Sequence, residues 1–97
     1  NKGFEIKRKL IEVDVDRIKE LIYDSNEELN NKNLKLVLAN YDIIRNIYYN
    51  LSFNDKKKVK KICSKFYEKL ISYLRDKEIK YIADFGFLPE IHVFKRN

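Results

Sequence analysis

The chain has 97 residues, the length of one small domain, and its 44% hydrophobic content with only two glycines and one proline excludes disordered, collagen-like and disulfide-scaffold classes. The formal net charge is +6, and all of the excess lies in residues 51–97, which carry twelve basic and six acidic side chains against nine and nine in residues 1–50. Such asymmetry is a hint of an anionic partner.

Two further classes are excluded on composition. No apolar run reaches the roughly 18 residues that a membrane-spanning helix needs, and no leader peptide is recognisable. Cys63 is the single cysteine, so it can form neither an internal disulfide nor a zinc cluster. We therefore expect a cytoplasmic protein without a membrane span.

The first helix is predicted at about residues 15–30, with Asp14 or Asp16 as N-cap. Its inward positions recur at helical spacing: Val15, Ile18, Leu21, Ile22, Ser25 and Leu29. Carboxylates step every four residues along the other side, at Asp16, Glu20, Asp24 and Glu28. These could hold a hard cation or meet a basic partner. Because a metal site usually gathers ligands from several elements, we interpret them as a solvated face and predict no metal.

The second helix is predicted at about residues 34–50, after the polar stretch NNKN, in which Asn33 is a candidate N-cap. One face carries Leu34, Val37, Leu38, Tyr41, Ile44, Tyr48 and Leu51, and Leu36, Ile43 and Ile47 lie around the back. A helix that is apolar on more than one side is usually packed between neighbours. We therefore expect this helix to be the middle one.

The third helix is predicted at about residues 53–76, where the apolar periodicity is the cleanest in the chain. Ser52 and Asp55 have the spacing of a capping box. The inward stripe consists of Val59, Ile62, Cys63, Phe66, Leu70, Tyr73 and Leu74. Short polar connections join the three helices, which favours an up-down-up arrangement.

The chain ends are harder to interpret. Residues 1–14 and 77–97 mix β-branched and aromatic residues with partial alternation, and Gly86 and Pro89 interrupt the second segment. Two interpretations fit this pattern: the segments form two or three short strands, or the third helix continues to about Ala83 and ends at Gly86. We favour terminal arms, extended or as short strands. The predicted fold is a single mainly α domain, a three-helix bundle of residues 15–76 between these arms.

Five lysines occupy six positions at residues 56–61, and the helical wheel places them on a face of the third helix rather than on a tail. The simplest interpretation is a solvated side. The functional alternative is contact with nucleic-acid phosphates, for which lysine suffices as a point charge. The candidate contacts are Lys57, Lys60, Lys61, Lys65 and Arg75, and Tyr49 and Tyr67 are rings at the margins where a base could stack.

Catalytic chemistry is not recognisable. His92 is the single histidine, and its apolar surroundings in the sequence IHVF indicate a structural role. Cys63 lies on the inward stripe, so we expect a buried, inert thiol. Two glycines leave no phosphate-binding loop. We predict no enzyme activity and no cofactor.

Residues 18–51 resemble a single tetratricopeptide-type helical hairpin of the kind found in uncharacterised archaeal proteins. Ser25 occupies the family's small-residue position, Leu34 the large apolar position that opens the second helix, and Tyr41 the large aromatic position further on. The resemblance covers about a third of the chain. It implies a scaffold class and brings no ligand and no catalytic residue.

The leading functional hypothesis is a non-catalytic helical interaction domain whose partner is a protein, either a second copy or part of a larger assembly. The contact residues would be Leu36, Ile43 and Ile47, if the third helix leaves them uncovered. The alternative is nucleic-acid binding through the basic face of the third helix.

Overall fold

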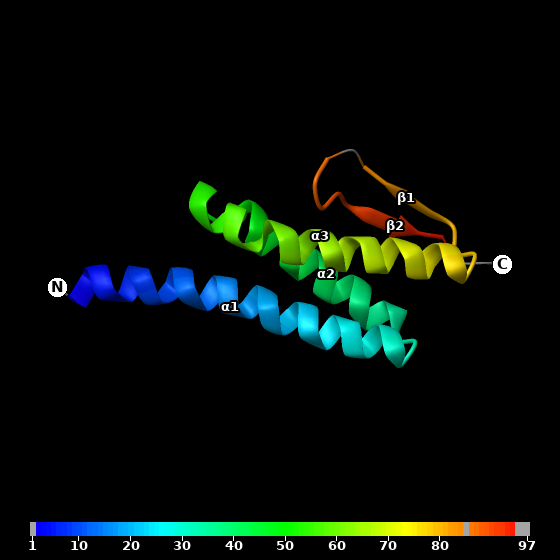
Figure 1. Cartoon of the computed structure of the whole chain (residues 1–97), viewed down its shortest axis with the longest axis horizontal. Coiled ribbons are helices and arrows are strands. Elements are labelled where there is room, and N and C mark those ends of the chain that lie inside the picture. The colour runs from blue at the N-terminus through cyan, green and yellow to red at the C-terminus, as the bar shows by residue number, and fades with distance from the viewer. Residues whose placement is uncertain (1, 85, 95–97) are drawn as a thin grey trace.

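The computed structural model describes residues 2–84 and 86–94, with side chains from residue 14 onward. In chain order the elements are α1 (Lys2–Asn30), α2 (Leu34–Tyr49), α3 (Phe53–Asp76), β1 (Tyr81–Ala83) and β2 (Ile91–Val93). The helices run in alternating directions, and the two strands lie along α3 (Figure 1). Helices account for 71% of the chain, so the mainly α fold with a small β arm is confirmed.

The N-terminal end of α1 differs from the prediction. The helix begins at Lys2, so an extended arm over residues 2–14 is wrong, and neither Asp14 nor Asp16 is an N-cap. No glycine or proline follows Gly3 before Asn30, so nothing in this sequence interrupts the helical hydrogen bonds. Ile11 also stands four residues before Val15 and continues the apolar repeat. The β-branched residues that suggested a strand are compatible with a helix at small cost.

The core lies where the three helices meet, and Leu88 of the C-terminal segment is buried in it. The buried apolar side chains are Ile18, Ile22, Val37, Tyr41, Ile44, Tyr48, Val59, Cys63, Phe66, Leu70, Ile71, Leu74 and Leu88. Phe66 is 1% exposed and Leu70 is fully buried, so the predicted inward stripe of α3 is confirmed. The lysines of this helix are left outside.

The helices are not spaced evenly around this core. The backbone of α1 packs closely against both α2 and α3, whereas α2 and α3 approach each other less closely. Aromatic rings fill that wider space: the centroid of Tyr41 lies 6.3 Å from that of Phe66 and 6.3 Å from that of Tyr67. Helix α2 does contact both neighbours, but α1 is the one with close backbone contact to both others.

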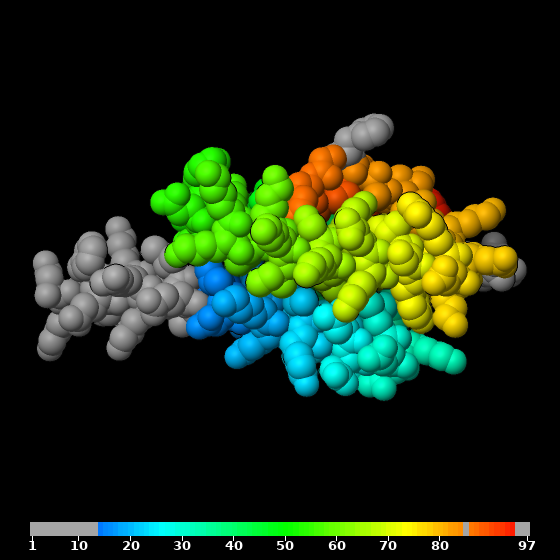
Figure 2. Space-filling view, viewed as in Figure 1, coloured from blue at the N-terminus to red at the C-terminus, as the bar shows by residue number. Residues whose placement is uncertain are grey.

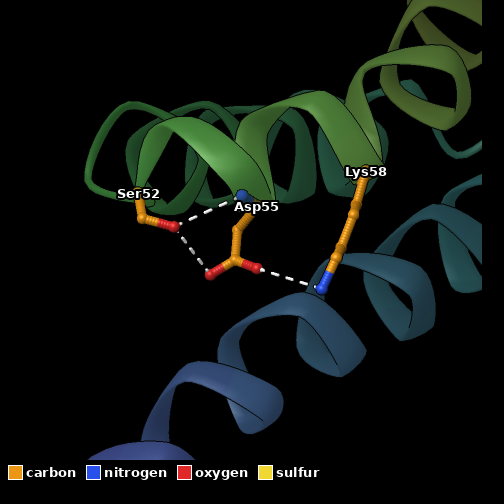
Figure 3. Close-up of polar contacts among 3 residues, drawn as sticks. All are labelled: Ser52, Asp55 and Lys58. Atoms are coloured by element: carbon orange, nitrogen blue, oxygen red, sulfur yellow. Dashed lines mark hydrogen bonds and ion pairs between the residues drawn. The ribbon is translucent and has the colours of Figure 1, made fainter.

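The first residues of α3 form the predicted cap (Figure 3). The Ser52 hydroxyl oxygen accepts a hydrogen bond from the Asp55 backbone N–H at 3.3 Å, and the hydroxyl donates to the Asp55 carboxylate at 3.0 Å. The other carboxylate oxygen lies 3.8 Å from the Lys58 ammonium. These contacts satisfy a helix-end donor and neutralise a buried carboxylate. By contrast, Asn33 makes no side-chain cap at α2, because its backbone is not extended (φ −93°, ψ 68°).

The C-terminal segment forms a β-hairpin instead of prolonging α3, which ends at Asp76. Glu78 has a left-handed φ of 55° in the turn that follows the helix. The strands pair antiparallel, with Ile82 opposite His92. In the connecting loop, Leu88 is buried, the Tyr41 hydroxyl donates to the Pro89 carbonyl at 2.5 Å, and the Tyr49 hydroxyl donates to the Phe87 carbonyl. The hairpin loop is therefore fastened to α2.

Candidate functional site

The predicted basic residues are all on the surface of α3, but they do not form one compact group. Lys57, Lys60, Lys61, Lys65 and Arg75 are each exposed. At a rise of about 1.5 Å per residue, the 18 positions between the first and the last of them span roughly 27 Å. Only the members near the start of the helix lie close to one another. The positive charge is therefore concentrated at the N-terminal part of α3.

That part of α3 belongs to a surface in which cations lie over aromatic rings, here named the cation–aromatic corner. It comprises Arg45 and Tyr49 of α2, Phe53, Lys56, Lys57 and Lys60 of α3, and Phe87 of the hairpin loop. The Lys57 ammonium lies 5.1 Å from the centroid of the Phe53 ring, and the Lys60 ammonium lies 5.6 Å from that of Phe87. In the space-filling view, the start of α3 (green) stands beside the hairpin loop (orange) at the surface (Figure 2).

The α2 side of the corner has the same chemistry. The Arg45 guanidinium lies 5.7 Å and the Lys56 ammonium 6.0 Å from the centroid of the Tyr49 ring. The Nε atom of Arg45 is buried without a hydrogen-bond partner, and Arg45 forms no ion pair within the described residues. Tyr48 packs beneath, 5.0 Å from the Phe87 ring, so the rings are held by the core.

The sequence predicts part of this corner but not all of it. Tyr49, Lys57 and Lys60 were predicted as candidates, whereas Arg45, Phe53, Lys56 and Phe87 were not. The spacing of Phe53 and Lys57, one helical turn apart, was an available signal. Phe87 could not be found in this way, because the folded hairpin brings it to α3. The other predicted ring, Tyr67, is half-buried against the Tyr41 ring.

A second surface is the outer side of α2. Leu36 is 42% exposed and Ile43 is 37% exposed, while Ile47 is half-buried and packs against the core. These positions are seven and four residues apart, so they follow one face of the helix. Only three of the 16 residues of α2 are charged, against eleven of the 24 residues of α3. The outer side of α2 is therefore an apolar strip, here named the α2 face.

A groove of about 660 Å³ lies between α1 and α3. Its walls include Ile22 and Leu29 of α1 and Phe66 and Tyr73 of α3. Asn26 also lines it, and the Oδ1 atom of this residue is buried without a hydrogen-bond partner among the described residues. Lys65 is the one predicted nucleic-acid contact at this groove.

The acidic side of α1 is as solvated as predicted. Asp16, Glu20 and Asp24 are exposed, and Glu28 is half-buried. Over residues 14–84 and 86–94 there is no group of three or more His, Cys, Asp or Glu side chains that could hold a metal ion. None of the described helices combines the length and the apolar composition that a membrane-spanning segment requires.

His92 is exposed, although its neighbours in the sequence are apolar. Its side chain is 63% exposed, and its Nε2 atom lies 3.9 Å from a Glu90 carboxylate oxygen. The reason is strand alternation: Ile91 and Val93 point to the half-buried side of β2, so the residue between them points outward. The ion pair with Glu90 requires a protonated imidazole.

Cys63 is fully buried, as predicted, and burial raises the pKa of its thiol from 9.0 to about 11. We expect the folded chain to resist iodoacetamide at neutral pH and the unfolded chain to react, because the thiolate is the nucleophile. The thiol of the unfolded chain ionises at a lower pH than the buried thiol of the folded chain. Cys63 therefore has no effect on stability below pH 9.0, and it lowers the stability of the fold as the pH rises towards about 11. Mass spectrometry of alkylation with and without denaturant tests this; rapid labelling of the folded chain would contradict it.

No family model matches the chain, and neither a curated protein nor a solved structure shows significant similarity to it. The resemblance of residues 18–51 to a tetratricopeptide-type hairpin therefore stays a prediction. At its small-residue position, Ser25 is fully buried and its hydroxyl donates to the Leu21 carbonyl at 2.6 Å.

Proposed function

We propose that this chain is a non-catalytic helical interaction domain that binds a protein partner through the α2 face. The observation that carries the proposal is the exposure of Leu36 and Ile43 on a helix whose opposite side forms the core. Burial of these side chains by a partner removes apolar surface from water, which favours association. The α2 face is thus a preformed strip on a rigid element.

The pattern of the α2 face indicates the chemistry of its partner. Apolar residues one and two turns apart are the anchors used when a helix lies against an apolar groove or another helix. Ala39, which is exposed between Leu36 and Ile43, lets a partner approach the backbone closely. The scarcity of charge along α2 favours an apolar partner surface over an ionic one. A second copy of the chain and a different protein both meet this description.

Replacement of Ile43 with aspartate should abolish association without unfolding the chain. A carboxylate at a buried anchor costs desolvation free energy, and a central anchor contributes about 2 kcal/mol or more, which corresponds to roughly 30-fold in affinity. Sedimentation equilibrium of the purified chain measures self-association, and affinity capture measures binding of a different protein. Circular dichroism reports the helicity.

The matched control is Ile82→Asp, the same substitution at an isoleucine of β1 that is 56% exposed. We expect this control to associate as the wild type does. Association of the Ile43→Asp variant at wild-type strength would contradict the proposal. Loss of helicity in that variant would also contradict it, because Ile43 would then act as a core residue.

A further inference from the structure

We propose that the cation–aromatic corner binds single-stranded nucleic acid, with a base stacked on Phe53 and the adjoining phosphates held by Lys56, Lys57 and Lys60. This activity goes beyond the protein interaction assigned to the α2 face and uses different residues. The ligand class follows from two chemistries that occur together here: open aromatic ring faces and uncompensated positive charge.

Phe53 has the most accessible aromatic ring of the corner. Its side chain is 73% exposed, more than any other large hydrophobic residue in the described part of the chain. The Lys57 ammonium lies over the ring at 5.1 Å. Since a planar ring has two faces, one of them is free to stack on a base. Tyr49, which is 47% exposed, offers a second ring fixed by its hydrogen bond to the Phe87 carbonyl.

The cations of the corner have no carboxylate partners among the described residues. Lys56, Lys57 and Lys60 contact aromatic rings, and the nearby Asp55 carboxylate is engaged by Lys58 and the cap of Ser52. Arg45 likewise forms no ion pair in the described part. The corner thus carries four positive charges that a phosphate chain can neutralise.

The stability of α3 does not explain this arrangement. The start of a helix is the positive end of its dipole, where acidic residues are favourable and lysines are unfavourable. Asp55 supplies the favourable charge and Ser52 supplies the cap, yet Lys56, Lys57 and Lys58 follow directly in the first turns. Helix stability therefore does not account for Lys56 and Lys57, whereas binding of an anion would account for their charge.

A single strand fits the corner better than a duplex or a membrane. Bases in a duplex are stacked on one another, so an exposed ring at the protein surface cannot reach a base face. A membrane surface requires a broad apolar face beneath the cations. Here Phe53 and Tyr49 are the exposed rings, and Tyr48 and Phe87 are packed into the molecule.

The test is fluorescence anisotropy with labelled oligothymidylate, a labelled DNA duplex and vesicles that contain phosphatidylserine. We expect the oligothymidylate to bind most tightly, and log K to fall with log salt at a slope of about −2.1 to −2.8 for three to four phosphate contacts on a single strand. Phe53→Ala should weaken this binding by about fivefold to a hundredfold, the equivalent of a lost base stack.

Three control variants separate the corner from general charge. Tyr23→Ala removes a ring on α1 that is 67% exposed, and it should leave binding unchanged. The double variant Lys57→Gln, Lys60→Gln should flatten the salt slope by about 1.4, whereas Lys19→Gln, Lys35→Gln should not. Ile43→Asp should bind oligothymidylate as the wild type does. A wrong assignment of the α2 face would therefore show in protein association, and a wrong assignment of the corner would show in oligothymidylate binding.

Equal or tighter binding of the duplex, with no effect of Phe53→Ala, would overturn the single-strand assignment in favour of phosphate contact alone. Vesicle binding without oligothymidylate binding, or no binding to any probe, would overturn it as well. Circular dichroism checks the fold of each variant. Phe53→Leu, which keeps an apolar side chain but removes the ring, must also lose affinity; if it binds as the wild type does, stacking is refuted.

Discussion

Replacement of Phe66 with alanine is expected to lower the free energy of unfolding by about 3–5 kcal/mol. The ring is 1% exposed and lies between α2 and α3, where it contacts the Tyr41 ring at a centroid distance of 6.3 Å. Its removal leaves a cavity at the widest helix spacing of the bundle. Since small domains have a total stability of about 5–15 kcal/mol, the loss should be visible as a large shift of the urea midpoint.

The matched control for this prediction is Phe53→Ala. Its ring is 73% exposed, so the same substitution should change stability by no more than about 0.5 kcal/mol. Similar losses from the two variants would contradict the arrangement in which the apolar stripe of α3 turns inward and Phe53 turns outward. The control also supplies the folded variant required for binding measurements at the corner.

The second large effect is expected at Tyr41. Tyr41→Phe removes the hydroxyl that donates to the Pro89 carbonyl at 2.5 Å, and Pro89 is buried. A buried carbonyl without a donor costs about 1–3 kcal/mol. Burial also raises the pKa of Tyr41, so its hydroxyl stays protonated and acts as a donor well into the alkaline range. Urea denaturation measures the loss, and hydrogen exchange at the amides of β1 and β2 reports whether the hairpin loosens.

Tyr73→Phe serves as the control for Tyr41→Phe. Tyr73 is a half-buried residue of α3 whose hydroxyl makes no hydrogen bond within the described part of the chain. It should lose less stability than Tyr41→Phe and leave the exchange of the hairpin unchanged. Equal effects of the two substitutions would show that the contact with the Pro89 carbonyl does not hold the hairpin to α2.

The helices α2 and α3 could be predicted from the sequence because each combines a polar break with a regular apolar repeat. The cap of α3 could also be predicted, because Ser52 and Asp55 are only three residues apart and their contact does not depend on the rest of the fold. The start of α1 was not predicted. The β-branched residues of this segment favoured a strand, but residues 4–14 contain no glycine or proline that would interrupt a helix. The cap predicted at Asn33 failed because its conformation is set by the α1–α2 turn, in which Lys32 has a φ of 62°.

For the candidate surfaces, the sequence predicts which side of a single helix each side chain lies on. The five basic residues of α3 are exposed, because helical periodicity places them away from the core. Periodicity also places Leu36 and Ile43 on the outer side of α2, but whether the third helix would cover them could not be predicted. Ile47 is half-buried, since its position on the wheel lies nearer the neighbouring helices. The cation–aromatic corner was not predictable as a unit, because its residues come from α2, α3 and the hairpin loop. Tertiary packing, not spacing, brings them together.

The most direct test of the proposed function is affinity capture from native lysate, with and without nuclease, using the wild type, Ile43→Asp and Phe53→Ala. The wild type and Phe53→Ala should retain a protein partner after nuclease treatment, and Ile43→Asp should lose it. If nuclease releases every captured protein, or if Ile43→Asp retains the same partner as the wild type, the α2 face is not a protein-binding surface.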